Sequence, residues 1–163
     1  MLEILVASIN PVLNNKIKDY VYSEKHKWKE GLYNVKALTS GYNPPYKFFD
    51  ELYDFSYETL KKHTKKDWKK SCWWATYYSQ SDHCDPHNHQ PETLSAIAIV
   101  KAASTNPLYF RENDKEYDIK EHDGMMLFFD SKYSHGVREC KEERITCALD
   151  FVPKIPKDSR NIN

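Results

Sequence analysis

Residues 93–102 read TLSAIAIVKA, and this stretch decides the fold of the chain. Nearly every residue from Leu94 to Val100 is apolar, which is typical of a strand that is buried on both faces. A second apolar run, GMMLFFDS at 124–131, ends in a polar turn. Two apolar runs in such close succession predict a core of β-strands.

Short candidate strands surround these two runs. They cover residues 72–79, 107–111, 116–120, 135–139 and 144–152, and Asn113-Asp114 supplies a hairpin turn between the second and the third of them. Many short strands separated by turn signals favour a sandwich or a barrel. We therefore predict a mainly β fold with N-terminal helices, in which residues 71–153 form a double-stranded β-helix of the jelly-roll, cupin-like type.

The first 70 residues have a different character. Residues 1–6 predict a first strand and residues 12–26 a helix, and between residues 47 and 70 apolar side chains recur near helical spacing. Six lysines crowd the end of that segment: Lys61, Lys62, Lys65, Lys66, Lys69 and Lys70. We interpret them as a solvated helix face with cations near its C-terminus rather than as a contact patch. Residues 1–163 are predicted to form one domain, with 1–70 as a mixed, partly helical support and 154–163 as a tail.

The composition is that of an ordinary globular protein. Lys plus Arg and Asp plus Glu number 24 each among 163 residues, so charge does not indicate binding to nucleic acid or to a membrane surface. No apolar run approaches the ~20 residues that span a bilayer, and the N-terminus does not resemble a signal peptide. The four cysteines lack C-x-x-C spacing. We expect a cytoplasmic protein with reduced thiols.

Metal-ligand residue types gather in residues 81–89, which read SDHCDPHNH. In an extended chain, residues i and i+2 point to the same face, so His87 and His89 can bind one ion. His83 and Asp85 have the same spacing. Imidazole and carboxylate ligands together suit Fe(II), Mn(II) or Zn(II). A lone His-x-His pair also occurs in polar surface loops, so the downstream residues decide.

Downstream, His135 follows the second apolar run, and Arg144 begins the last strand. An arginine at the start of an apolar strand is costly to bury without an anion, and its guanidinium pairs with a carboxylate bidentately. The alternative is an ion pair with Glu142, Glu143 or Asp150. A ligand pair, a distant histidine and an arginine, in this order, predict a metal site beside an anion site.

The stretch from about Trp73 to Val152 resembles the 2-oxoglutarate/Fe(II)-dependent oxygenase superfamily, especially small bacterial and phage-encoded members with an H-x-H first motif. The first half of the pattern is D-x-x-x-P-H-x-H and a Leu-Ser strand, matched here by Asp82, Pro86, His87, His89 and Leu94-Ser95. The second half is a Gly-apolar-Phe strand, Ser-x-x-x-His and Glu-Arg-Ile, matched by residues 124–131, His135 and Glu143-Arg144-Ile145.

The resemblance implies a non-heme Fe(II) dioxygenase that uses 2-oxoglutarate and O₂ to hydroxylate a substrate. It implies that His87 and His135 bind iron and that Arg144 binds 2-oxoglutarate. The superfamily usually has His-x-Asp or His-x-Glu as its first pair, whereas this chain has His89 in the second position. Either His87, His89 and His135 form a three-histidine site, or His89 lies beside the metal without binding it. The alternative pairs are His83 with Asp85 and Asp85 with His87.

Two other functions remain open from the sequence. One is a cupin-like metal protein that does not use 2-oxoglutarate, and the other is a non-catalytic binding module on the same fold. Tyr77, Tyr78 and Thr146 are candidate cavity residues, although aromatic side chains in a β core more often serve packing. No motif identifies the primary substrate, so the expected partner is a small-molecule cosubstrate, with nothing that indicates nucleic acid or a membrane.

Overall fold

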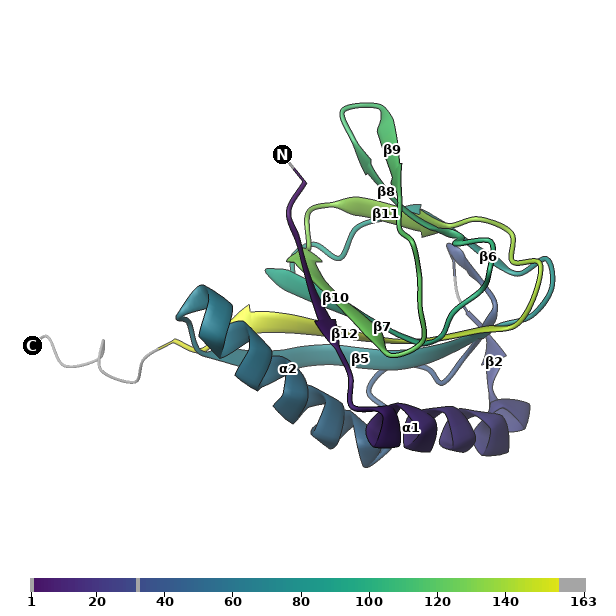
Figure 1. The fold of residues 1–163 in the computed structure, drawn as a ribbon, viewed down its shortest axis with the longest axis horizontal. Coiled ribbons are helices and arrows are strands. Elements are labelled where there is room, and N and C mark those ends of the chain that lie inside the picture. Colours follow the sequence, from purple (N-terminus) through teal and green to yellow (C-terminus); the bar gives the residue numbers. More distant parts are fainter. Residues whose placement is uncertain (1, 32, 156–163) are drawn as a thin grey trace, which may run out of the picture.

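The computed structural model describes residues 2–31 and 33–155, which form two facing antiparallel sheets with helices on one outer face (Figure 1). The larger sheet comprises, in spatial order, β1 (Ile4–Ser8), β10 (Met125–Asp130), β7 (Leu94–Lys101), β12 (Arg144–Pro153), β5 (Trp68–Tyr78), β4 (Leu38–Thr39) and β2 (Lys29–Glu30). The smaller sheet comprises β3 (Val35–Lys36), β6 (His83–His87), β11 (Ser134–Val137), β8 (Leu108–Glu112) and β9 (Lys115–Asp118). The predicted mainly β, jelly-roll architecture is confirmed.

Strand β7 shows why the apolar run at 93–102 decides this architecture. Its side chains alternate between two cores, as the period of a strand requires. Ile97 and Ile99 pack between the sheets, whereas Ala96 and Ala98 pack toward the helices. The small alanine side chains let the helices lie close to the sheet, and the larger isoleucines fill the space between the sheets.

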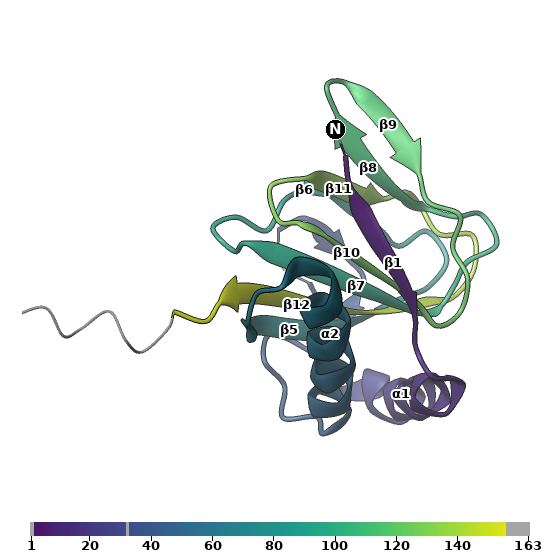
Figure 2. The same ribbon diagram turned by 60° about the vertical axis from the view of Figure 1, so that its left-hand side comes forward.

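Both helices pack on the outer face of the larger sheet (Figures 1 and 2). Helix α1 (Pro11–Glu24) begins after Asn10, whose side chain accepts a hydrogen bond of 2.8 Å from the Val12 N–H, and a short 3₁₀ turn (Lys25–Lys27) follows it. Helix α2 (Phe48–Thr64) buries Phe49 and Leu52 against the sheet.

Helix α2 ends earlier than the lysine-rich segment predicted. Lys65 adopts the left-handed conformation that terminates the helix, and Trp68 begins strand β5. Lys69 and Lys70 therefore lie on a strand and not on the helix, so this part of the helix prediction is wrong. Trp68 is buried, and its indole N–H donates to the Thr64 hydroxyl, which links the end of α2 to the start of β5.

The N-terminal residues contribute strands as well as helices. Strand β1 pairs with β10 at one edge of the larger sheet, and β4 pairs with β5 near the other edge. The hairpin of β8 and β9 projects from the smaller sheet (Figure 2), and its turn residues Asn113 and Asp114 both have positive φ, as predicted for a tight hairpin. Of the predicted tail, residues 156–163 lie outside the described residues.

All four cysteines are free, and burial raises the pKa of the Cys84 thiol to about 12. No helix within the described residues is long and apolar enough to cross a membrane.

Candidate metal centre and anion site

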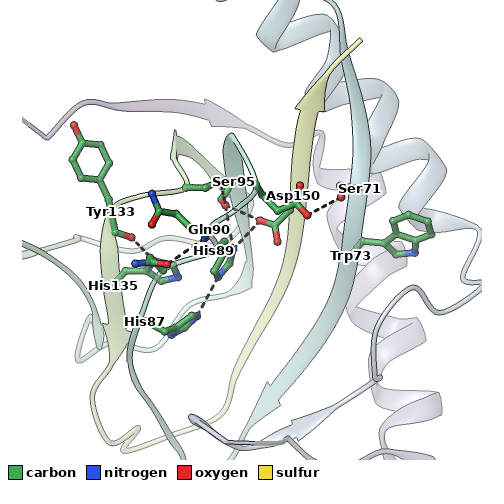
Figure 3. Close-up of polar contacts among 12 residues, drawn as sticks. Ser71, Trp73, His87, His89, Gln90, Ser95, Tyr133, His135 and Asp150 are labelled. Carbon is green, nitrogen blue, oxygen red and sulfur yellow. Dashed lines mark hydrogen bonds and ion pairs between the residues drawn. The ribbon is translucent and has the colours of Figure 1, made fainter. Parts of the chain in front are cut away.

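Three histidine side chains converge at the end of the cavity between the sheets (Figure 3). His87 ends β6, and His135 is its registered partner on the neighbouring strand β11. His89 lies two residues beyond β6, where its backbone N–H donates to the Ser131 carbonyl at 3.0 Å. Potential ligand atoms of the three imidazoles all lie within 4.8 Å of one another, and the Nε2 atoms of His87 and His89 are 3.1 Å apart.

The Nδ1 atom of each imidazole faces an oxygen acceptor. In His87 this acceptor is the Asp85 carbonyl at 2.9 Å, and in His135 it is the Tyr133 carbonyl at 3.3 Å. In His89 it is a carboxylate oxygen of Asp150 at 2.7 Å. Since carbonyl and carboxylate oxygens only accept, each Nδ1 carries the proton and each Nε2 is left with a free lone pair. The arrangement therefore presents three convergent lone pairs.

The surroundings of the histidines keep two of them neutral. Burial lowers the pKa of His87, although its hydrogen bond to the Asp85 carbonyl acts in the opposite direction. Burial also lowers the pKa of His135 well below its usual value, and the neighbouring His87 and His89 lower it further. A neutral imidazole is the form that binds a metal ion.

The depressed pKa of His135 predicts that acid destabilises the metal-free protein. The unfolded chain takes up a proton on this side chain near pH 6.5, whereas the folded protein does so only at lower pH. The free energy of unfolding should therefore fall as the pH drops from about 6.5 toward the folded-state pKa. Thermal unfolding in the presence of a chelator, at about pH 7.5 and about pH 5.5, measures this difference.

His135→Asn should reduce the drop in unfolding temperature between the two pH values, because its amide can still donate to the Tyr133 carbonyl but does not titrate. His63→Asn, at an exposed position on α2, is the matched control and should retain the full drop. An unchanged pH dependence in His135→Asn would show that other groups cause the acid effect.

The histidines open onto a cavity of about 400 Å³ that is bounded by one face of β5 and of β12. Alternate residues of β12 line it, among them Arg144, Thr146 and Asp150. Of the three candidate cavity residues, Tyr78 and Thr146 line this cavity. Tyr77 instead points to the opposite face of β5, where its hydroxyl donates to Glu143, because neighbouring strand residues face opposite sides.

Arg144 is fully buried and pairs with Glu121, a residue of the loop between β9 and β10. Its Nε lies 3.1 Å and 2.9 Å from the two Glu121 oxygens, and its Nη2 lies 2.9 Å from Oε1. Within the described residues, Nη1 has no hydrogen-bond acceptor. The partners suggested from the sequence, Glu142, Glu143 and Asp150, were wrong, because the described carboxylate that reaches Arg144 is that of Glu121.

The alternative ligands lie apart from the three histidines. His83 and Asp85 line a separate, smaller depression on the smaller sheet, and His83 Nε2 lies 3.7 Å from a carboxylate oxygen of Asp85. The Asp85 side chain is 60% exposed. Among the described residues, the cluster of potential ligands contains His87, His89 and His135 and no carboxylate.

Sequence reasoning did not find four residues that support the site. Glu121 holds Arg144, and Ser95 and Asp150 lie beside His89 (Figure 3). The fourth residue is Ser131, whose hydroxyl is hydrogen-bonded to that of Ser95. The sequence pattern could have indicated Asp150, because it is the one carboxylate in an apolar strand. It lies an even number of residues after Arg144, so both side chains face the same side of the strand. Glu121 carried none, since its role depends on where a loop passes.

Solved structures with the same fold include several oxygenases. A prolyl-4-hydroxylase from Pseudomonas putida matches with a TM-score of 0.74 and 11% identity over 95% of both chains. A prolyl hydroxylase from Trichoplax adhaerens, in complex with a hypoxia-inducible-factor peptide fragment, has a TM-score of 0.73 and 9% identity over 91% of this chain and 82% of its own. A viral collagen prolyl hydroxylase from Paramecium bursaria Chlorella virus-1, solved with 2-oxoglutarate, has a TM-score of 0.68 and 9% identity over 93% and 96%.

No protein-family model matches the sequence, and no curated protein is similar to it in sequence. The likeness to these oxygenases is therefore one of fold.

Proposed function

We propose that this protein is a non-heme Fe(II) and 2-oxoglutarate-dependent dioxygenase that hydroxylates a C–H bond of its primary substrate. The observation that carries the proposal is that one ring nitrogen from each of three imidazoles lies within 4.8 Å of the others, beside a cavity that is also lined by a buried guanidinium. The fold shared with prolyl hydroxylases supports it.

The donor set of His87, His89 and His135 fits Fe(II). Each imidazole has an oxygen acceptor beside its Nδ1, which leaves Nε2 available to a metal ion. Three protein ligands on one side of a metal ion leave its other positions open for a cosubstrate and O₂. When bound, Fe(II) supplies the activation of O₂ that this class of hydroxylation requires.

Arg144 is the proposed anchor for the distal carboxylate of 2-oxoglutarate. Glu121 occupies the Nε and Nη2 edge of the guanidinium and fixes its orientation. The Nη1 donors have no acceptor within the described residues, and Arg144 lines the same cavity as the three histidines. A carboxylate in the cavity can accept from these donors. The cavity volume of about 400 Å³ suits a small cosubstrate.

One observation favours a second candidate function, a cupin-like metal enzyme that does not use 2-oxoglutarate. The Glu121 carboxylate already neutralises Arg144, so the arginine has a structural partner without any ligand. The absence of a carboxylate from the cluster of potential ligands, among the described residues, fits this reading as well.

One anaerobic experiment separates the two functions. The metal-free protein is titrated with Fe(II), the loaded protein is titrated with 2-oxoglutarate by calorimetry, and O₂ is then admitted while succinate is measured. We expect one iron per chain, 2-oxoglutarate binding that requires iron, and slow succinate release. Because the Trichoplax structure contains a peptide fragment, peptides are the first class of primary substrate to test for faster release.

Stoichiometric iron without 2-oxoglutarate binding would favour the second candidate. A protein that binds no iron under these conditions would contradict both and would favour a binding module on the same fold.

A further inference from the structure

The three histidines differ in what holds them. Backbone carbonyls accept the Nδ1 protons of His87 and His135, whereas His89 donates to the side chain of Asp150 on β12. Only His89 is therefore in contact with a group that carries a formal negative charge. His89 is also the residue that occupies the position where the resembled pattern has Asp or Glu.

Asp150 is buried within a small polar network between the sheets. It is 4% exposed, and its Oδ1 lies 2.7 Å from His89 Nδ1 and 2.6 Å from the Ser95 hydroxyl. The Ser95 hydroxyl in turn lies 2.8 Å from that of Ser131, which follows β10. The carboxylate thus accepts two hydrogen bonds, and the network joins residues of β7 and β12 with the residue that follows β10.

No lysine or arginine of the described residues forms an ion pair with Asp150. A buried carboxylate is costly unless a positive charge or sufficient hydrogen bonding compensates it. His89 links Asp150 to the point on which the three Nε2 atoms converge. A cation bound there would add a positive charge to the two hydrogen bonds that already stabilise the Asp150 carboxylate.

On the basis of the proposed iron site, we propose that Asp150 is a positioning residue that supplies, through His89, the negative charge absent from the ligand set. Three neutral imidazoles leave the full charge of a divalent ion, whereas two imidazoles and a carboxylate reduce it by one. A carboxylate that accepts the Nδ1 proton of a ligand histidine raises the basicity of that ligand and fixes its tautomer and ring orientation. Asp150 does this for His89 from strand β12 of the larger sheet.

The first test is the affinity for Fe(II) of Asp150→Asn, which keeps the side-chain shape and removes the charge. We expect a loss of about 10–100-fold relative to wild type, with the fold retained. Asp130→Asn, at an exposed carboxylate one residue before Ser131, is the matched control and should bind Fe(II) like wild type. Equal affinities in wild type and Asp150→Asn would overturn the proposal and leave the iron site itself intact.

The second test asks whether charge is what Asp150 contributes. In the double variant His89→Asp, Asp150→Asn, the carboxylate moves from the outer position to the metal itself. We expect Fe(II) affinity to recover above that of Asp150→Asn alone. If the double variant binds no better than Asp150→Asn, the charge is not the contribution of this residue.

A spectroscopic measurement distinguishes positioning from a merely structural role. In Zn(II)-loaded protein with ¹⁵N-labelled histidine, each ligand imidazole should show a protonated Nδ1 and a metal-bound Nε2. The Nδ1 proton of His89 should be displaced downfield by its carboxylate partner. Asp150→Asn should move this resonance and leave those of His87 and His135 in place.

Should Asp150→Asn fail to fold, Ser95→Ala removes one donor to the same carboxylate and should displace the same resonance. A His89 imidazole that is protonated at Nε2 in the wild-type protein would overturn the assignment of Asp150. Wild-type protein that binds neither metal would overturn the proposed function instead.

Discussion

Replacing His135 by alanine is expected to abolish stoichiometric Fe(II) binding. His135 is 3% exposed and lies in register with His87 on the neighbouring strand, and the cluster of potential ligands among the described residues contains only one histidine besides these two. His87→Ala should have the same effect, because the two imidazoles that remain, those of His89 and His135, are too few to hold the ion. Anaerobic calorimetry or equilibrium dialysis measures the iron content, and circular dichroism verifies the fold.

His83→Ala and Asp85→Ala are the matched controls for the ligand assignment. Both side chains lie on the smaller sheet beside the separate depression, so both variants should retain stoichiometric iron. If these two variants lose the metal while His87→Ala keeps it, the ligand pair lies four residues earlier in the chain. His89→Ala should abolish binding if His89 binds the ion, and should weaken it only about 10–100-fold if His89 acts from beside it.

Arg144→Lys is expected to weaken 2-oxoglutarate binding severely while iron binding is retained. Arginine can contact Glu121 through Nε and Nη2 while Nη1 binds a second carboxylate. Lysine keeps the charge, but its single nitrogen lacks this fork. The loss of a charged hydrogen bond in a buried site costs on the order of 2–5 kcal/mol. Calorimetric titration of the iron-loaded variant with 2-oxoglutarate measures this loss. Arg111→Lys, in an exposed pair with Glu116, is the control and should bind like wild type.

The Arg144→Ala variant has a different and informative consequence. The Glu121 side chain is 0% exposed, and without Arg144 its charge is buried and uncompensated. Breaking a buried pair in this way typically destabilises a protein by about 3–5 kcal/mol. Lower stability in Arg144→Ala combined with unchanged 2-oxoglutarate binding in Arg144→Lys would assign this arginine a structural role only.

Local patterns determined most of the fold. The apolar run of β7 is buried on both faces because the helices cover one side of the larger sheet and the smaller sheet covers the other. The Asn113-Asp114 turn produced the predicted hairpin, since both residues tolerate positive φ. The prediction of helix through Lys69 and Lys70 was wrong because Lys65 ends α2, and the buried Trp68 then pairs in β5.

The sequence also predicted which residue types form the candidate site and in which order they occur. The pattern consists of two histidines two residues apart, followed by a later histidine and an arginine. How they meet was decided by sheet pairing. His87 and His135 meet because β6 and β11 are neighbours in register, and His89 reaches them from a loop rather than from the strand that the spacing suggested.

The supporting charges depend on the tertiary structure alone. Glu121 reaches Arg144 from a loop, and Asp150 reaches His89 across the space between two sheets. Such pairings are set by how separate strands and loops pack: the alternation along β12 places Asp150 on the same face as Arg144, but nothing along the chain identifies His89 as its partner. The sequence by itself therefore determined which side chains can bind a metal and an anion, whereas the tertiary structure decided which carboxylate holds each of them in place.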